Sequence, residues 1–235
     1  MFTRIDEILP KVFKISVSTN KQFVFSQFLI LDECPMLIHT GHSKWFNAIH
    51  ELVSSVCNPA EIRYIAFCHL EADECGALNE WLKVAPEAVP LVSPLNRANI
   101  DDIAIRKVHV LKNNESISLG AKNITLIETP HFPHGWEGCL FYEPQDCVLF
   151  CSDLAAHKGH FDTPLTNEDL TESVIKFQRQ LGFMVEGKTF TRGIEAIKKF
   201  PIKYLATMHG SVIYGDSILK MLHELQVNFG VPQTS

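Results

Sequence analysis

The sequence predicts a layered α/β fold, with β-strands in both halves of the chain and helices between and after them. Short apolar runs with strand-like patterns recur in both halves. Helix-forming stretches with polar starts follow several of these runs. The 235 residues contain no internal repeat, low-complexity tract or obvious linker, so we expect a single domain over residues 1–235.

The composition excludes several classes of protein. Apolar residues make up 46% of the chain, enough for a sizeable core, and the net charge of −6 comes without the basic stripe of a nucleic-acid-binding protein. No apolar run approaches the roughly 20 residues of a membrane span, and the first residues lack the pattern of a secretory signal. The seven cysteines form no CxxC pair, which speaks against a disulfide framework, a zinc ribbon or a rubredoxin-type iron site. We therefore expect a cytoplasmic protein that binds neither nucleic acid nor membrane.

Strands and helices alternate in the first half. We expect strands over residues 12–18, 22–31, 36–39, 64–68 and 89–93, and helices over residues 44–56, 77–84 and 96–104. Residues 32–35 form a turn, and Ser43 is a cap for the helix that follows it. His39 and His42 lie between these two features without an accompanying carboxylate, so we interpret them as structural or supporting residues.

The second half begins with further strands and ends with helices. We expect strands over residues 108–111, 115–119, 123–128, 139–143, 147–151 and 202–206, and helices over residues 167–181, 189–199 and 216–227. Residues 144–146 make the turn of a hairpin, and Thr166 and Asn167 are cap candidates for the helix over residues 167–181.

Three side chains with metal-binding chemistry follow the predicted strand over residues 64–68. They are His69, Glu71 and Asp73, placed on the turn into a helix. One imidazole and two carboxylates within five residues are typical of a metal site with hard oxygen ligands. The alternative interpretation of this segment alone is a solvated acidic turn.

The same placement recurs at three other predicted strand ends. The four groups are His69 with Glu71 and Asp73, His131 with His134, Asp153, and His209. Loops at strand ends are where folds place functional side chains. Counting one of the two loop histidines, these are six nitrogen and oxygen ligands, more than the three protein ligands of a catalytic zinc ion. They suit two metal ions roughly 3.5–4 Å apart that share a bridging carboxylate.

This order of motifs resembles the metallo-β-lactamase superfamily. The hydrolases of that superfamily usually carry HxHxDH, whereas this chain has glutamate at the second histidine position, Glu71, and again at the last, Glu74. The substitution at Glu71 is similar to the flavodiiron branch, and the chain resembles most closely its short relatives without a flavodoxin domain, the oxygen-binding diiron proteins. The resemblance extends from about Phe23 to His209.

The resemblance implies an αββα sandwich and a set of iron ligands. His69, Glu71 and one loop histidine hold the first iron, Asp73 and His209 hold the second, and Asp153 bridges them. We choose His134 as the loop histidine because it precedes Asp153 by 19 residues (153 − 134 = 19), similar to the family's spacing, which leaves His131 as a supporting or pocket residue. A histidine usually occupies the position of Glu74 in flavodiiron proteins. Glu74 is therefore open to three interpretations: a weak ligand, a hydrogen-bond partner of a ligand, or a bare charge.

The function that the resemblance implies is binding of O2 or NO at a non-haem diiron site, as an oxygen sensor or a reductase component. Three carboxylates and two divalent ions leave a site charge of about +1, and the extra anionic oxygen favours iron; zinc and manganese are the alternative metals. Redox turnover would need an external electron donor, and sensing would need a signalling partner. The sequence is compatible with a homo-oligomer. The main alternative is a binuclear metallohydrolase, for example of phosphodiesters. A metal-free structural relative is the third hypothesis.

Further side chains are candidates for shaping the pocket. The segment with His157, His160 and Asp162 is either a polar surface loop or a lid that donates protons. Phe132, Trp136 and Phe161 are the aromatic candidates for pocket walls, and the alternative is that they simply pack against their neighbours.

Overall fold

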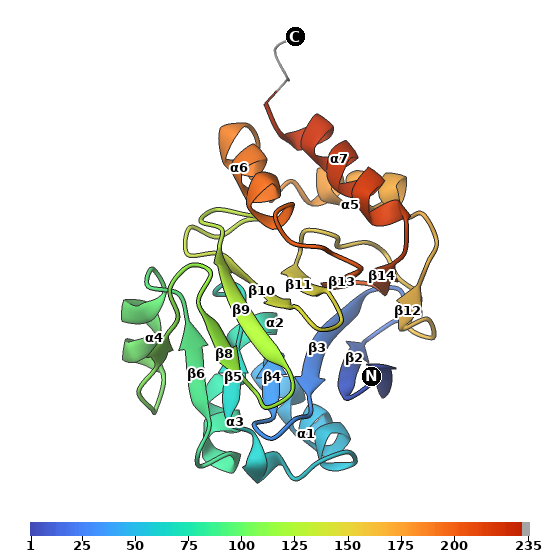
Figure 1. Ribbon diagram of the computed structural model, residues 1–235. Helices are drawn as coiled ribbons and strands as arrows, with labels where there is room; N and C mark the ends of the chain where they lie inside the picture. The colour runs from blue at the N-terminus through green and yellow to red at the C-terminus, as the bar shows by residue number, and fades with distance from the viewer. Residues whose placement is uncertain (232–235) are drawn as a thin grey trace.

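Two β-sheets lie face to face between two layers of helices (Figure 1). The structure is a computed structural model that describes residues 1–231. Helices α1 and α3 cover the outer face of one sheet, and α5, α6 and α7 cover the outer face of the other. This four-layer arrangement confirms the αββα sandwich.

The first sheet contains seven strands in the order in which they follow along the chain. These are β1 (Phe2–Leu9), β2 (Val12–Ser18), β3 (Val24–Ile30), β4 (Met36–Ile38), β5 (Tyr64–Ala66), β6 (Val89–Val92) and β7 (His109–Val110). Pairing is antiparallel from β1 to β4 and parallel from β4 to β7.

The second sheet has the order β12-β14-β13-β11-β10-β9-β8. Its strands are β8 (Ser116–Ser118), β9 (Asn123–Glu128), β10 (Cys139–Glu143), β11 (Val148–Ser152), β12 (Leu165–Thr166), β13 (Tyr204–Thr207) and β14 (Val212–Tyr214). Strands β8 to β11 form an antiparallel meander, and β13 lies parallel to β11. The ends of β11 and β13 therefore meet at one edge of the sheet.

The helices are short, and most lie on the outer faces. They are α1 (Phe46–Ser54), α2 (Ala72–Cys75), α3 (Leu78–Val84), α4 (Arg97–Ile103), α5 (Thr171–Leu181), α6 (Lys188–Ile197) and α7 (Ser217–Phe229), with 3-10 turns at Ser43–Trp45 and Pro59–Glu61. No helix within residues 1–231 is both long enough and apolar enough to cross a membrane.

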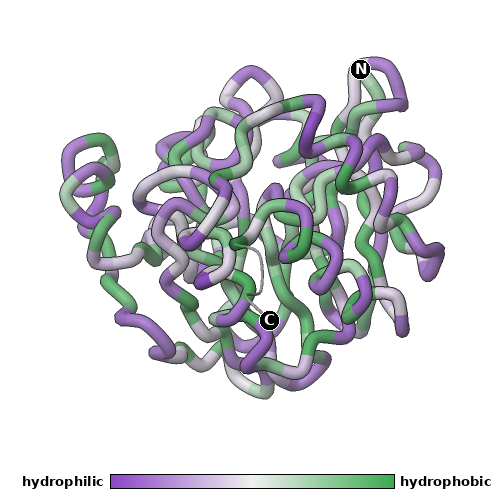
Figure 2. The backbone as a smooth tube through the Cα atoms, turned by 90° about the horizontal axis from the view of Figure 1, so that it is seen from above, coloured by the Kyte–Doolittle hydropathy of each residue, from purple (hydrophilic) through white to green (hydrophobic). Residues whose placement is uncertain are grey.

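The core follows from the alternation of the strands. In β2, Ile15 and Val17 pack with α1 and α3, while Val12 faces the core between the two sheets. Successive side chains of a strand point to opposite faces, so one strand supplies both cores. The tube view shows hydrophobic stretches running through the middle of the molecule and hydrophilic loops mostly around it (Figure 2).

Several predicted boundaries are wrong. Residues 2–9 form the edge strand β1, and β12 and β14 also lie where the sequence predicted no strand. Helix α5 begins at Thr171, so neither Thr166 nor Asn167 is its N-cap, which is Leu170. Ser43 belongs to a 3-10 turn whose N-cap is His42, and α1 begins only at Phe46.

Candidate metal centre

The four predicted groups come together at one edge of the sandwich. His69 and Glu71 follow β5, and Asp73 lies in α2 directly after them. Asp153 follows β11 and His209 follows β13, which lie side by side. The sixth side chain, His134, comes from the loop between β9 and β10.

A backbone hydrogen bond joins the two sheets near this edge. The N–H of Cys139, the first residue of β10, donates to the carbonyl oxygen of Cys68 over 2.9 Å. Since Cys68 immediately precedes His69, this bond places the end of β5 beside the second sheet. The motif on the first sheet therefore faces the strand ends of the second.

Asp153 lies at the centre of the group. Its Oδ2 is 3.0 Å from Nε2 of His134 and 3.6 Å from Nε2 of His69. Its Oδ1 is 3.3 Å from Nε2 of His209. One carboxylate oxygen thus faces two imidazoles, and the other oxygen faces the third.

Two carboxylates flank Asp153, one on each side. Glu71 lies 3.5 Å from Nε2 of His69 and 3.7 Å from Nδ1 of His134, measured to its two carboxylate oxygens. Ligand atoms of His69, Glu71, His134 and Asp153 all lie within 4.8 Å of one another. On the other side, Oδ2 of Asp73 is 3.5 Å from Nε2 of His209. The geometry has two halves that share Asp153.

A backbone hydrogen bond orients His209 toward the centre. Nδ1 of His209 lies 3.0 Å from the carbonyl oxygen of Val24. A carbonyl only accepts, so Nδ1 carries a proton, and the other ring nitrogen, Nε2, faces the centre, where a metal ion can take the place of its proton. Metal-binding histidines are commonly fixed in this way by a partner at the second nitrogen.

Unpartnered buried atoms show that a cation fits here. Nε2 of His69 and Oδ1 of Asp153 are buried without a hydrogen-bond partner among the described residues. A buried polar atom left unpaired costs about 1–3 kcal/mol. Both atoms point into the space between the carboxylates and imidazoles, where metal ions would pair them.

The electrostatic field of the centre favours positive charge. Burial by itself would lower the pKa of His69, but the neighbouring carboxylates of Glu74, Glu71 and Asp153 raise it to about 10. Burial opposes ionisation of Asp153, yet the hydrogen bond from His134 and the charges of His209 and His69 hold the pKa of its carboxyl below the usual range. The pKa of Asp73 is raised to about 6, chiefly by burial. The carboxylates would attract a cation as they attract the protons of these imidazoles.

The structure separates the two loop histidines. His134 lies beside Asp153, whereas His131 is exposed and lines a different cavity with Thr189 and Arg192. Gly135, which has a positive φ of 77°, follows His134, and a Cβ atom at this position would lie 3.2 Å from Cβ of His69. The loop therefore approaches the β5 motif closely at His134.

His157 lies neither in a polar surface loop nor in a lid over the metal centre. It is buried, its Nδ1 lies 2.9 Å from the carbonyl of Ala155, and its Nε2 accepts from the N–H of Ser211 at 3.0 Å. It thus ties the segment after Asp153 to the segment after His209. His160 and Asp162 are exposed, which agrees with the interpretation as a polar surface loop.

The aromatic neighbours of the centre differ from the predicted ones. The ring of Phe23 stacks on His209 with centroids 4.4 Å apart, Phe25 meets the same imidazole edge-on at 5.1 Å, and Phe183 lies 4.5 Å from the ring of His134. In contrast, Phe132 packs against Phe190, Phe161 packs against Phe2, and Trp136 is 52% exposed. The three aromatic neighbours carry no chemical signature in the sequence, and only the fold shows their position.

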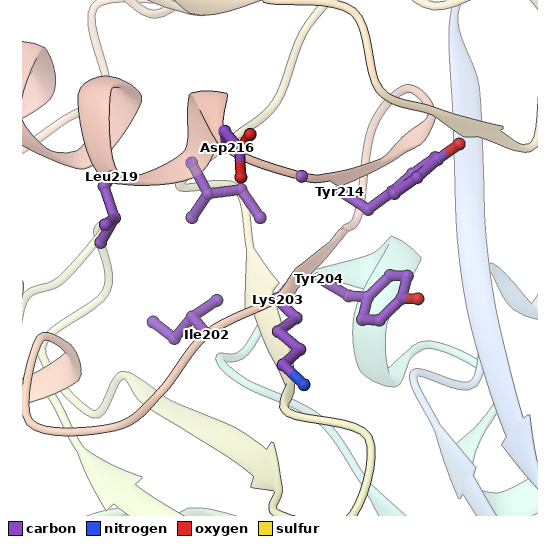
Figure 3. Close-up of a pocket in the computed structure, with 8 residues that line it drawn as sticks. Ile202, Lys203, Tyr204, Tyr214, Asp216 and Leu219 are labelled. Carbon is purple, nitrogen blue, oxygen red and sulfur yellow. The ribbon is translucent and has the colours of Figure 1, made fainter.

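A cavity of about 450 Å³ lies away from the centre. Tyr204, Tyr214, Lys203 and Asp216 line it together with Ile202, Ile218 and Leu219 (Figure 3). Tyr204 is the first residue of β13, whereas His209 follows the end of that strand. None of the six residues of the centre lines this cavity, so its size does not mark the site of the chemistry.

The chain is similar in sequence to a flavo-diiron protein and to a flavorubredoxin. It is 24% identical over 217 residues to the flavo-diiron protein FprA2 of Clostridium acetobutylicum, covering 89% of this chain and 54% of that protein. It is 30% identical over 203 residues to the anaerobic nitric oxide reductase flavorubredoxin of Salmonella arizonae, covering 80% and 41%. The chain spans about half the length of the curated relatives that it matches.

Solved structures share the fold. The flavodiiron protein of Giardia intestinalis superposes with a TM-score of 0.85 at 16% identity, over 97% of this chain and 59% of that one. The rubredoxin oxygen:oxidoreductase of Desulfovibrio gigas gives a TM-score of 0.81 at 16% identity, over 94% and 60%. At these identities the likeness establishes the αββα fold.

A family profile covers most of the chain. The family described as ODP family beta lactamase matches residues 23–210. That range holds all six side chains of the centre, from His69 to His209. The resemblance found in the motifs is confirmed, and the chain belongs to the ODP family of beta lactamases.

Proposed function

We propose that this chain is a non-haem diiron protein that binds O2 or NO. His69, Glu71 and His134 hold one iron, Asp73 and His209 hold the other, and Asp153 bridges them. The observation that carries the proposal is the position of Asp153, whose two carboxylate oxygens face imidazoles of the two different halves.

The donor set supports iron. Three imidazoles and three carboxylates offer borderline nitrogen and hard oxygen ligands, with no thiolate among them. Bound iron would supply the redox chemistry needed to bind and reduce O2 or NO, which zinc lacks. The names of the relatives, a flavo-diiron protein and a nitric oxide reductase, support the same choice.

Residues around His209 orient its imidazole and make its surroundings apolar. The carbonyl of Val24 fixes the ring of His209 so that Nε2 faces the centre. Phe23 and Phe25 cover that ring with apolar surface, which suits a small, weakly polar ligand and limits access of water to the centre.

The biological setting is also a proposal. The chain acts in the cytoplasm, as one domain, with an external electron donor if it reduces its ligand or a signalling partner if it senses it. A homo-oligomer is compatible with either role. The hydrolase alternative is not favoured, because the curated relatives named above are diiron and nitric oxide reductase proteins.

The test is a titration of the protein with O2, and separately with NO, after anaerobic loading with Fe(II). We expect an absorbance change that saturates at about one ligand per pair of irons. Asp153→Ala should abolish the change, while His160→Ala, which alters an exposed residue, should leave it intact. A protein that shows no absorbance change with either O2 or NO, but hydrolyses phosphodiesters with zinc or manganese bound, would contradict the proposal.

A further inference from the structure

Glu74 follows Asp73 in α2, but its side chain lies on the other side of His69. It is fully buried, with 0% of its surface exposed. We infer that Glu74 is a positioning residue that fixes the imidazole of His69 for metal binding and does not itself bind metal. This inference rests on the proposed diiron site and assigns a role to the residue that stands where flavodiiron proteins usually have a histidine.

Three donors occupy the carboxylate of Glu74. Its Oε2 accepts from the backbone N–H groups of Cys68 at 2.7 Å and of His69 at 2.9 Å. Its Oε1 accepts from the hydroxyl of Ser152 at 2.6 Å. Hydrogen bonds to an ionised acceptor are stronger than neutral ones, and backbone donors cannot turn away. The carboxylate is therefore held at the ends of β5 and β11, where Cys68 and Ser152 lie.

The same contacts set the proton on His69. Nδ1 of His69 lies 3.1 Å from the hydroxyl oxygen of Ser152 and 3.3 Å from Oε1 of Glu74. The hydroxyl proton of Ser152 is already donated to Glu74, so both oxygens near Nδ1 can only accept. Nδ1 therefore carries a proton, which leaves Nε2 as the nitrogen available to metal; it is the buried, unpartnered atom that faces Asp153 and Glu71.

Two further buried side chains, His39 and Cys68, lie next to Glu74 on the side away from the metal centre. His39 has its Nε2 3.5 Å from Oε1 of Glu74 and 3.5 Å from Sγ of Cys68. Ligand atoms of these three residues lie within 4.8 Å of one another, as in a metal site. Burial raises the pKa of the Cys68 thiol well above its ordinary value, and a metal needs the thiolate. We therefore interpret this group as support for Glu74.

The two halves of the centre consequently have different numbers of ligands. The half built on His69 has three residues of its own, counting Glu71 and His134, besides Asp153. The other half has only Asp73 and His209 besides Asp153. If Glu74 were a ligand, its removal would weaken the second half. If Glu74 positions His69, its removal weakens the first.

The test combines metal affinity with the proton state of His69 in Glu74→Gln. An amide of the same size keeps one acceptor for the backbone but places an N–H donor opposite Ser152 and His69, so Nδ1–H of His69 loses the carboxylate oxygen and keeps only the hydroxyl of Ser152 as an acceptor. We expect one ion to bind about 10–100-fold more weakly, and it should be the ion that His134→Ala also weakens. The ion that His209→Ala weakens should keep its affinity.

The second readout is nitrogen-15 NMR of the histidine rings, in the metal-free and the zinc-loaded full chain. In the metal-free wild type, where its pKa is raised to about 10, His69 should carry protons on both ring nitrogens. In the zinc-loaded wild type it should keep its single proton on Nδ1, and Glu74→Gln should shift or broaden that signal. Glu137→Gln is the matched control, because Glu137 is also a buried carboxylate that accepts from a backbone N–H, that of Leu70 at 2.8 Å. It should leave the ring signal of His69 unchanged.

Two results would overturn the inference: loss of the second ion in Glu74→Gln, or a zinc-loaded wild-type His69 with its proton on Nε2. The wild-type spectrum decides this point even if Glu74→Gln does not fold. Failure of the proposed function is seen separately, as a wild-type chain that binds no pair of irons.

Discussion

Asp153 combines burial with three imidazole neighbours, which is why its carboxyl stays ionised despite its 2% exposure. Without a cation, the imidazoles must supply the positive charge that balances it. With two cations, they can be neutral ligands. The cluster is therefore suited to exchange protons for metal ions, so metal binding should weaken as the pH falls.

The two loop histidines provide a matched pair of substitutions. His134→Ala removes an imidazole 3.0 Å from Asp153, and we expect the iron content to fall by about one ion per chain. His131→Ala changes an exposed residue of the same loop and should leave the iron content unchanged. Metal analysis after anaerobic loading with Fe(II) measures both. Equal loss in both variants would contradict the assignment of His134.

Lys14 predicts a pH dependence of stability. It is 1% exposed, its Nζ donates to the carbonyl of Gly210 at 2.5 Å, and burial lowers its pKa from 10.5 to about 7. Between these two values the unfolded chain binds the proton more strongly. The contribution of Lys14 to the free energy of unfolding should therefore rise as the pH increases from about 7 to 10.5, by roughly 5 kcal/mol, since one pKa unit corresponds to about 1.4 kcal/mol.

Lys14→Met isolates this contribution. The difference in the free energy of unfolding between wild type and variant, measured in urea across that pH range, should change in favour of the wild type as the pH rises. Other titrating groups, which both proteins share, cancel in the difference. Parallel curves for the two proteins would show that Lys14 keeps an ordinary pKa.

At the residue scale, the sequence predicted which side chains come together but not how each one points. The placement of His, Glu and Asp residues at strand ends can be recognised from the amino-acid sequence. The opposite directions of Asp73 and Glu74 were not, because α2 is only four residues long and shows no periodicity. The burial of His157 was equally hidden, since it depends on contacts with a segment more than fifty residues away, at Ser211.

At the scale of single elements, helix α6 fixes the loop that carries His134. Gly193 on α6 faces Phe132 of that loop, and a Cβ atom at Gly193 would lie 2.3 Å from the ring. In an exposed helix, replacing glycine by alanine would stabilise by about 1 kcal/mol. Here the overpacking, which costs about 1–3 kcal/mol, should dominate.

Gly193→Ala should therefore lower the free energy of unfolding by up to about 2 kcal/mol. It should also weaken iron binding, because Phe132 and His134 share the loop. Glu195→Ala alters an exposed position of the same helix and should change stability by less than about 0.5 kcal/mol. Denaturant unfolding and metal analysis test both variants. A stabilised Gly193→Ala would show that Phe132 moves aside freely.

The elements that sequence analysis missed share a physical cause. Strand β1 lies at the edge of its sheet, pairs only with β2 and is mostly half-buried, so its residues lack a clear apolar alternation. Strands β12 and β14 have two and three residues and gain their structure from pairing with each other and with β13. Patterns of such length cannot be recognised before the partners are known.

For the whole molecule, the centre depends on long-range closure of the sandwich. His69 lies on one sheet and Asp153 and His209 on the other, and the two sheets meet at the Cys139–Cys68 hydrogen bond. Metal ions that bind only the folded chain would therefore stabilise it. At 100 times the dissociation constant, one ion adds about 2.7 kcal/mol.

Anaerobic addition of Fe(II) should accordingly raise the unfolding temperature by roughly 5–10 °C for a chain of this size. A chelator should reverse the increase. Asp153→Ala should show little increase, because the ion pair would then lack its shared carboxylate. Calorimetry or circular dichroism measures the shift, and an equal increase in Asp153→Ala would mean that the metal binds elsewhere.

The most direct test is the metal stoichiometry of the purified chain after anaerobic loading with Fe(II) and removal of loose metal. We expect two irons per wild-type chain, and at most one in Asp153→Ala. A wild-type chain that retains one iron or none would contradict the diiron centre, as would one whose two irons survive the loss of Asp153.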